Sequence, residues 1–428
     1  MKRHARKGRR AVPGPVRTPS PRSALFLRGG IVVVSVLLAA TLIFVAIRIP
    51  PRIAPSGMNI GPAPAASVYR PTEKWLQRAY AIDVLFHRVY TPCWEGAYGA
   101  IGDAHLFAVT GDSALLRFYV VSHPFTEMCR QTWIDDQAWV CLAEMYWWRF
   151  TGKNNMVWVA DAARRYTEAR ESGGLSSHEG FWSWYNFPPN TAPKVAPQAP
   201  GQEQIFTNSN MNQMATVACW LYEVTHERRF LDDALLVWNG DQSAPGIEKT
   251  YYRGNGRWVG KSGLAAFGNP LPWMGAGYCS LAAALYSVTG EERYRRVAAA
   301  TAKRVMDPAT GWVDPVDFFQ ISMDGNGAFV HFLLDAYQIA PEELKELPGN
   351  VEKSLEYVWT NGHGKAPVLL HRETDHGIRN GWNGRGGEDG YRVGEVGTVH
   401  AQGEAVRAFG LYAYVANVVI PRSSGARK

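Results

Sequence analysis

Two adjacent aspartates, Asp135 and Asp136, are the residues of this chain whose type and spacing point most directly to chemistry. They begin a long, mostly apolar segment and stand between Trp133 and Trp139. Hydrolysis of a glycosidic bond with retention of configuration needs two carboxyl groups about 5 to 5.5 Å apart, one as nucleophile and one as acid/base. Neighbouring Cα atoms are about 3.8 Å apart, and helical side chains diverge by about 100° per residue. Adjacent aspartates can therefore reach this separation, whereas the wider spacing of an inverting site is hard for them to reach.

A second interpretation of the pair is purely structural. Aspartate is a favoured residue at a helix start, where it caps backbone N–H groups and interacts well with the helix dipole. A catalytic pair would instead separate its two protonation states, because a carboxyl group beside a carboxylate resists ionisation. The flanking tryptophans and the apolar helix behind the pair favour the catalytic interpretation.

An internal repeat indicates which elements position the pair. A motif that ends in Val-Thr-Gly at 106–111 recurs in related form at 147–152, 221–226 and 285–290, with His in place of Gly in the third copy. Each copy is expected to end an apolar helix with a glycine-type C-cap and to precede an amphipathic helix. The threonines are 41, 74 and 64 residues apart, so the repeat is a helix hairpin with variable insertions and not a rigid solenoid.

Residues 68–420 have room for about twelve helices with their connections, and long alternating runs typical of strands are absent. We predict an all-α (α/α)6 toroid with an inner ring of apolar helices and an outer ring of amphipathic ones. An open superhelical array is the alternative. The aromatic and polar insertions at 182–186 and 269–274 favour a closed barrel, because they could line one end of it.

The amino-terminal part predicts a membrane anchor. Residues 1–30 form a basic tail, with nine Lys and Arg and no acidic residue among the first 28. Residues 31–47 carry no charge, and 17 helical residues span about 25 Å, which is enough for a short transmembrane helix. The basic side is expected in the cytoplasm, so the later residues would lie outside it as a single-pass protein. The alternative to an anchor at 31–47 is a cleavable signal peptide. Residues 48–67 are rich in Pro and Ala and are predicted to form a linker.

Charge and cysteine content exclude some classes of protein. Removing the nine basic tail residues from the net charge of +7 leaves −2, so the main domain gives no indication of a nucleic-acid partner. Five cysteines in 428 residues are too few for a disulfide framework. Cys141, Cys219 and Cys279 lie in apolar runs and are expected as buried thiols, whereas Cys93 and Cys129 could pair.

Aromatic residues next to polar amides supply candidate sugar contacts. Flat rings stack on the C–H faces of sugars, while amides and carboxylates bond the hydroxyl groups. Several of the sixteen tryptophans stand beside Gly, Asn or Pro and are expected to be exposed in loops, namely Trp94, Trp182, Trp184, Trp258, Trp273, Trp312 and Trp382. The residues that we select as substrate contacts are Trp133, Trp139, Trp184, Tyr185, Asn208, Asn212, Trp273 and Asp324.

Residues 133–143 (Trp-Ile-Asp-Asp-Gln-Ala-Trp-Val-Cys-Leu-Ala) resemble the Asp-Asp-x-Ala-Trp-x-x-Leu-Ala signature of glycoside hydrolase family 76. That family comprises endo-α-1,6-mannanases and related fungal transglycosylases. Residues 207–212, 273–277 and 324–330 are similar to further segments of the family, although Pro-Trp-Met-Gly at 272–275 and Asn-Gly-Ala-Phe at 326–329 depart from its pattern. The resemblance implies an (α/α)6 toroid in which Asp135 is the nucleophile and Asp136 the acid/base.

The expected function is that of a membrane-anchored retaining glycosidase acting on α-1,6-linked mannan-type glycans without a cofactor. The partners would be a polysaccharide or oligosaccharide and, through the amino-terminal helix, a lipid bilayer. No metal is expected, because the spacing of His363, His371 and His376 fits no common zinc pattern. The alternatives are another toroid glycosidase or transglycosylase, such as an unsaturated uronyl hydrolase, and a non-catalytic glycan-binding envelope protein.

Overall fold

All regular elements that the structure describes are helices, apart from two isolated β-bridges, Leu175 with Trp182 and Tyr252 with Trp258. The structure is a computed structural model, and it describes residues 73–92, 94–122, 134–152, 155–175, 182, 213–258, 272–310, 326–361 and 396–423. These ranges all belong to one unit, Pro55–Lys428. The predicted tail, anchor helix and linker at 1–67 lie outside the described residues.

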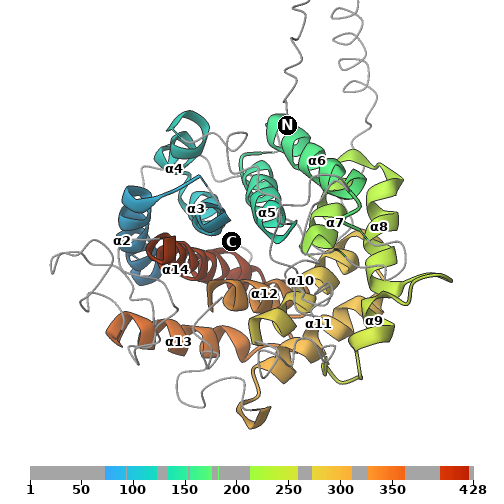
Figure 1. Cartoon of the computed structure of the whole chain (residues 1–428). Helices are drawn as coiled ribbons and strands as arrows, with labels where there is room; N and C mark the ends of the chain where they lie inside the picture. The colour runs from blue at the N-terminus through green and yellow to red at the C-terminus, as the bar shows by residue number, and fades with distance from the viewer. Residues whose placement is uncertain are drawn as a thin grey trace, which may run out of the picture. The chain divides into compact units, whose positions relative to one another are not determined.

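Six helices form a closed inner ring. They are α3 (Trp94–Thr110), α5 (Ile134–Phe150), α7 (Gln213–Thr225), α10 (Pro272–Thr289), α12 (Asn326–Ile339) and α14 (Val396–Tyr414). Each contacts the next in this order, and α14 packs against α3, which closes the ring (Figure 1). All residues of α5 are buried, which explains why most of them are apolar and why its apolar residues are not confined to one face.

The outer layer consists of α2 (Lys74–Val89), α4 (Ser113–Arg117) with the π-helix η1 (Phe118–Ser122), α6 (Met156–Glu171), α8 (Arg228–Asn239), α11 (Glu292–Val305) and α13 (Leu347–Asn361). Each packs on inner helices: α2 contacts α14 and α3, α6 contacts α5 and α7, and α11 contacts α10 and α12. In α11, Tyr294 and Val297 are buried while Glu292 and Arg296 are exposed, as expected for an amphipathic helix. The short elements are α9 (Gly246–Tyr251), η4 (Pro308–Thr310), η5 (Val415–Val419) and α15 (Ile420–Ser423).

This arrangement confirms the all-α (α/α)6 toroid, and the open superhelical array is wrong because the first and last inner helices contact each other. No helix in the described ranges is long and apolar enough to cross a membrane, and the predicted span at 31–47 is not among them. Cys141, Cys219 and Cys279 are buried free thiols as predicted. Cys93 and Cys129 lie outside the described residues.

The repeated motif ends four inner helices in the same way. Its threonine hydroxyl donates to the carbonyl oxygen four residues earlier at 2.7–2.8 Å in every copy. The residue after the threonine adopts positive φ, with values of 67° at Gly111, 80° at Gly152, 57° at His226 and 71° at Gly290. The predicted C-caps are therefore confirmed, including the copy in which histidine replaces glycine.

The prediction of exposed tryptophans in loops is wrong for Trp182 and Trp258, which are buried, and for Trp94 and Trp273, which lie in α3 and α10; Trp94 is also partly buried. Trp184, Trp312 and Trp382 lie outside the described residues. Trp182 is 0% exposed and packs edge-on against Tyr166 of α6, with ring centroids 5.2 Å apart. Trp258 is 5% exposed and stacks on Tyr278 of α10 at 3.9 Å. Neighbouring glycine and asparagine residues signal a loop, but a large ring beside a helix gains more by covering the core than by facing water.

Candidate active site

The aspartate pair occupies the first turn of α5, where Asp135 and Asp136 are the second and third helical residues. Their exposed fractions are 9% and 8%, so both carboxyl groups are largely withdrawn from solvent. One oxygen of Asp135, Oδ1, accepts a hydrogen bond from the backbone N–H of Asp136 at 3.0 Å. This bond uses a backbone donor that the helix leaves unpaired at its start, and it fixes the Asp135 carboxylate against its own helix.

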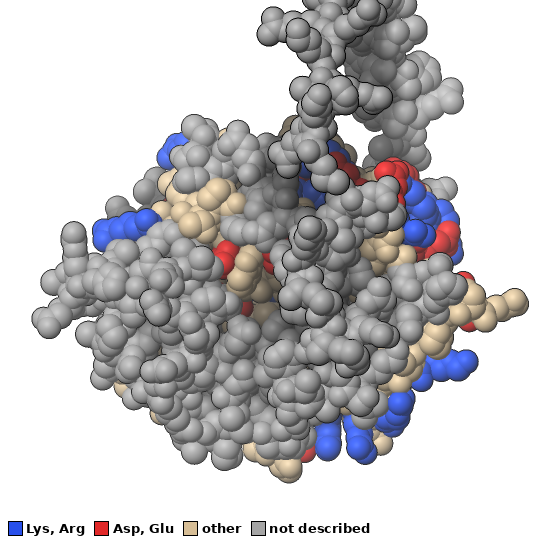
Figure 2. All heavy atoms as spheres, in the orientation of Figure 1, with Lys and Arg blue, Asp and Glu red and all other residues tan. Residues whose placement is uncertain are grey.

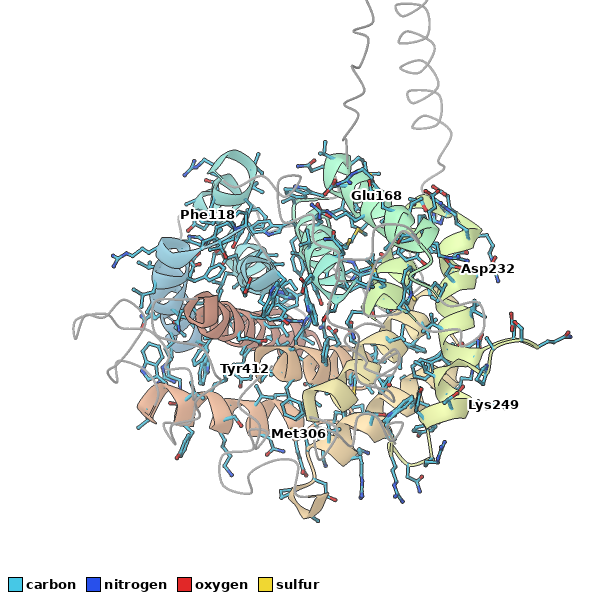
Figure 3. All side chains as sticks on the ribbon, viewed as in Figure 1. Phe118, Glu168, Asp232, Lys249, Met306 and Tyr412 are labelled. Carbon is cyan, nitrogen blue, oxygen red and sulfur yellow. The ribbon has the colours of Figure 1, made fainter. Side chains whose placement is uncertain are left out.

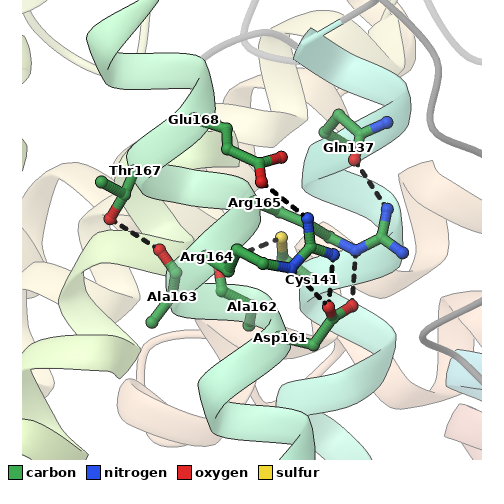
Figure 4. Close-up of polar contacts among 9 residues, drawn as sticks. All are labelled: Gln137, Cys141, Asp161, Ala162, Ala163, Arg164, Arg165, Thr167 and Glu168. Atoms are coloured by element: carbon green, nitrogen blue, oxygen red, sulfur yellow. Dashed lines mark hydrogen bonds and ion pairs between the residues drawn. The ribbon is translucent and has the colours of Figure 1, made fainter. Parts of the chain in front are cut away.

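The outward face of α5 is defined by its contacts with α6. Gln137 Oε1 accepts a hydrogen bond from Arg165 Nη1 at 2.8 Å, and Cys141 Sγ donates to the carbonyl oxygen of Ala162 at 3.7 Å (Figure 4). Arg165 is held in turn by Asp161, whose Oδ2 accepts from Arg165 Nε at 2.7 Å. The residue that directly follows the aspartate pair is thus tied to the outer ring by a buried cation.

The helical period then places the two aspartates on different faces. Asp135 is two residues before Gln137, or about 200° away, and so lies on the face opposite to α6. Trp139 shares that inward face four residues later, and its ring packs edge-on against Tyr98 of α3 at 5.0 Å. Asp136 lies about 100° from Asp135 around the helix. Asp135 therefore starts the inward-facing ridge of α5, and Asp136 starts the adjoining ridge.

A buried cation from α14 packs against this inward face of α5. The Arg407 guanidinium of α14 is 0% exposed and lies 4.5 Å from the centre of the Trp139 ring. Its Nε donates to His331 Nδ1 of α12 at 2.9 Å. Since Nδ1 accepts, the ring proton of the neutral histidine must be on Nε2, which lies 2.5 Å from the hydroxyl oxygen of Tyr146. Burial, followed by the nearby Arg407, lowers the pKa of His331 well below its usual value and keeps it neutral.

The network continues to a buried acid on α12. Tyr146 donates to Asp335 Oδ1 at 3.4 Å, and Ser280 donates to Asp335 Oδ2 at 2.7 Å. Burial raises the pKa of Asp335 to about 6, although the hydrogen bond from Ser280 opposes this shift. Tyr146 and Asp335 also line a cavity in the half of the ring where the inner helices end, and neither Asp135 nor Asp136 is among its lining residues.

Further acidic groups gather where the inner helices begin. Glu95 in the first turn of α3 is 2% exposed. Glu404 of α14 is also 2% exposed, and its Oε2 accepts from the backbone N–H of Ala328 in the first turn of α12 at 2.8 Å. Figure 2 shows acidic atoms in red near the middle of the displayed face, among the inner helices of Figure 1. Acidic side chains from three inner helices thus occupy the starting end of the ring.

The other residues selected from the sequence fall into two groups. Trp139 is described and is 1% exposed, because Tyr98, Phe332 and Arg407 cover its ring. Trp273 is the second residue of α10, but its side chain lies outside what the structure describes. The remaining selected residues all lie outside the described ranges, namely Trp133, Trp184, Tyr185, Asn208, Asn212 and Asp324. Their roles as substrate contacts stay predictions.

Sequence reasoning missed the buried network of Arg407, His331 and Asp335. A signal for it exists, because His331 and Asp335 stand four residues apart in an apolar helix and therefore share one face. Arg407 likewise interrupts an apolar stretch of α14. Isolated ionisable residues in helices that are otherwise apolar on all sides mark the polar interior of this ring.

Comparison with known proteins identifies the fold. No family model and no curated protein matches this chain. Among solved structures, the GH76A alpha-1,6-mannanase from Salegentibacter sp. HEL1_6 is 16% identical, covers 79% of this chain and 100% of its own, and has a TM-score of 0.56. The Lin0763 protein from Listeria innocua is 16% identical over 80% of this chain and 98% of its own, with a TM-score of 0.60.

Two further solved structures share this fold. Bt3792 of Bacteroides thetaiotaomicron, a glycoside hydrolase family 76 mannosidase, is 14% identical over 80% of this chain and 99% of its own, with a TM-score of 0.56. An inactive Salegentibacter variant with two consecutive aspartates replaced by asparagine was solved with alpha-1,6-mannotriose, and it is 17% identical over 79% of this chain and 100% of its own, with a TM-score of 0.56. The chain therefore has the helical toroid of glycoside hydrolase family 76.

Proposed function

We propose that this chain is a retaining glycoside hydrolase that cleaves α-1,6-linked mannan-type glycans. The observation that carries the proposal is the adjacent pair Asp135 and Asp136 in the first turn of an inner helix of this toroid. A structural neighbour with the same fold, an α-1,6-mannanase, is inactive when two consecutive aspartates are replaced, and it binds an α-1,6-linked mannotriose in that form. This likeness supports both the reaction and the substrate class.

The two carboxyl groups would act in turn. The Asp135 carboxylate attacks the anomeric carbon and forms a glycosyl ester, while Asp136 gives its proton to the departing glycosidic oxygen. In the second half, Asp136 takes a proton from water, the water oxygen attacks the anomeric carbon, and the Asp135 ester bond breaks. Asp135 faces the inside of the ring and Asp136 points in a different direction, which suits this division of roles, and both carboxyl groups are largely withdrawn from solvent.

Substrate contacts would come from aromatic rings and amides around the starting end of the ring. We assign this role to Trp133, Trp184, Tyr185, Asn208, Asn212, Trp273 and Asp324. Trp139, whose ring is covered, would instead form the packed base on which the first turn of α5 rests. Tightly packed side chains around Trp139 cannot move freely, so they would hold the aspartate pair in one geometry.

The test uses the full-length chain with defined oligosaccharides linked α-1,6, α-1,2 or α-1,3, together with unsaturated uronides. We expect cleavage of the α-1,6-linked mannosides only, and no turnover in the Asp135→Asn/Asp136→Asn double variant, which should still bind the oligosaccharide. Cleavage of uronides would instead identify another toroid glycosidase. Binding of glycan without turnover by the unaltered chain would identify a non-catalytic binding protein.

We further propose that residues 31–47 anchor the chain in a membrane, with the basic residues 1–30 in the cytoplasm and the toroid on the other side. The support is the uncharged run of 17 residues and the basic tail before it. Carbonate extraction of membranes from expressing cells, followed by protease treatment of intact cells, tests both parts. Recovery of the full-length chain in the soluble fraction would contradict the anchor.

A further inference from the structure

We propose that Asp83, His87 and Asp103 form a binding site for a divalent first-row transition-metal ion, with Zn²⁺ as the best fit, which joins outer helix α2 to inner helix α3. Asp83 and His87 are four residues apart on α2, and Asp103 is in the middle of α3. One donor atom from each of the three side chains lies within 4.8 Å of the other two. This cluster is separate from the proposed active site and does not depend on it.

The geometry of the imidazole ring is the first argument. His87 Nε2 lies 2.8 Å from Asp103 Oδ2 and 3.1 Å from Asp83 Oδ1. One N–H can point along only one hydrogen bond, so it cannot serve both carboxylates at these distances. A zinc ion with ligands at about 2.0–2.1 Å places tetrahedral donors about 3.3 Å apart. Both carboxylate oxygens are within about 0.5 Å of that spacing from Nε2, so small side-chain rotations would admit the ion.

Buried carboxylate oxygens that accept from no N–H are the second argument. Asp103 is 0% exposed and Asp83 is 3% exposed, and Oδ1 of each residue accepts from no N–H among the described residues, although the two carboxyl groups lie close enough to share a proton. Buried polar atoms are normally satisfied, and an unsatisfied carboxylate oxygen is costly. Among the described residues, no Lys or Arg side chain forms an ion pair with either acid, and His87 is the basic side chain beside them. A divalent cation would bind Asp83 Oδ1 directly, and it would also reach Asp103 Oδ1 if the Asp103 carboxylate binds through both of its oxygens.

The surroundings resemble the supporting groups of a metal site. The Tyr119 hydroxyl of η1 donates to Asp103 Oδ2 at 2.5 Å and orients that carboxylate. The His87 ring stacks on Phe118, with centroids 3.8 Å apart, and this contact fixes the plane of the imidazole. Phe118 is labelled in Figure 3, beside α2 and α3. The His87 side chain is 20% exposed and gives an ion a path from solvent, which the two acids lack.

The choice of ion follows from the donor set. One imidazole nitrogen and two carboxylate oxygens are ligands that Zn²⁺, Co²⁺ and Mn²⁺ accept. Ca²⁺ and Mg²⁺ prefer six or more oxygen ligands, so this set suits them less well. Sequence spacing could not reveal the site, because the third ligand comes from a different helix.

The test measures Zn²⁺ uptake by the metal-free full-length chain in equilibrium dialysis. We expect the unaltered chain to bind one more equivalent than His87→Gln, and Zn²⁺ to raise the melting temperature of the unaltered chain alone. His226→Asn, which removes an exposed histidine at a helix end where asparagine is tolerated, is the matched control and should keep the full stoichiometry.

One further variant and one spectroscopic measurement guard against a folding artefact. Tyr119→Phe keeps all three ligands and should bind one equivalent about 10- to 100-fold more weakly. Co²⁺ in the unaltered chain should show visible d–d absorption that is lost in His87→Gln. Equal Zn²⁺ uptake by the unaltered chain and His87→Gln, with both folded by circular dichroism, would overturn the proposal and leave the cluster as a hydrogen-bond network only.

Discussion

The two ends of the inner ring are built on different principles. Where α3, α5, α7 and α10 end, the same threonine hydrogen bond recurs, and the residue after the threonine has positive φ in all four helices. Where the inner helices begin, the polar residues differ from one helix to the next: Glu95 in α3, Asp135 and Asp136 in α5, and Gln213 in α7. One repeated local hydrogen bond is sufficient to end a helix, whereas the buried polar residues at the helix starts differ and so serve no common structural need.

This difference suggests that the end of the ring where the inner helices begin holds the candidate catalytic residues, and that the opposite end serves the fold. If it is correct, changes at the starting end should affect turnover more than folding, and changes at the ending half should affect folding alone. The Arg407 network lies between the two ends and should affect both.

The largest effect is expected at the starting end. Asp135→Asn should lower kcat by about 10⁴-fold or more on any substrate, because no covalent intermediate can form. Asp136→Asn should lower turnover of the natural glycan by about 10² to 10⁴-fold, but much less for an aryl mannoside whose leaving group needs no proton. Steady-state kinetics with both substrates measures this difference. If Asp136→Asn were as inactive as Asp135→Asn on the aryl substrate, the assigned roles would be wrong.

The next largest effect is expected for Arg407→Leu. The substitution removes the cation beside Trp139 and leaves His331 Nδ1 buried without its donor, so it should lower the free energy of unfolding by about 1 to 3 kcal/mol. Urea denaturation measures the change. Arg228→Leu is the control, because Arg228 pairs with Asp232 at the surface with 65% of its side chain exposed, and such pairs contribute at most about 1 kcal/mol. Similar losses in the two variants would show that the buried cation has no special role.

A pH-dependent effect is expected at Asp335. Burial raises its pKa to about 6 from the ordinary 3.8, so between these values the native state holds a proton that the unfolded chain has released. Stability from this group therefore falls as pH rises from about 4 to about 6, by about 3 kcal/mol in total, and is constant above that range. Asp335→Asn should lack this fall.

The pKa of buried His105 is lowered, so this residue makes stability rise with pH, in the opposite direction to Asp335. Burial lowers the pKa of His105 from 6.5 to about 3, so the unfolded chain binds the extra proton and stability rises with pH through this range. The informative quantity is therefore the difference between the urea stability profiles of Asp335→Asn and the unaltered chain. Parallel profiles from pH 4 to 6.5 would contradict the raised pKa.

The smallest effect is expected at the ending caps. Gly290 has φ of 71° and open space around it, so Gly290→Ala should cost about 1 kcal/mol through backbone strain alone. Gly290→Asn should cost less, because asparagine adopts this conformation more readily. Thermal unfolding of the two variants gives the order. A stabilising Gly290→Ala would show that the cap conformation is not required.

The ring itself could be predicted from the sequence because its signals are local. The threonine motif at 106–111 and its three copies mark helix ends through bonds within four residues, and the structure confirms all four. The contrast between the apolar α10 and the amphipathic α11 assigned these helices to the inner and outer rings. Helix-end motifs and the pattern of apolar residues can each be read from a short segment of the sequence.

The packing of individual rings could not be predicted in the same way. Trp182 and Trp258 lie near glycine or asparagine, as exposed residues often do, but partners from α6 and α10 bury them. The contacts of Arg407 with His331 and Trp139 join three helices that are far apart in the sequence. Contacts between distant helices depend on how the ring closes, and short sequence patterns do not predict this.

The configuration of the first sugar product tests the central claim most directly. Proton NMR during hydrolysis of an α-1,6-linked mannotetraose by the full-length chain would observe the new anomeric centre before it equilibrates. If Asp135 and Asp136 act as nucleophile and acid/base, the first product is the α-anomer. A β-anomer as the first product would contradict the adjacent pair as the catalytic carboxylates.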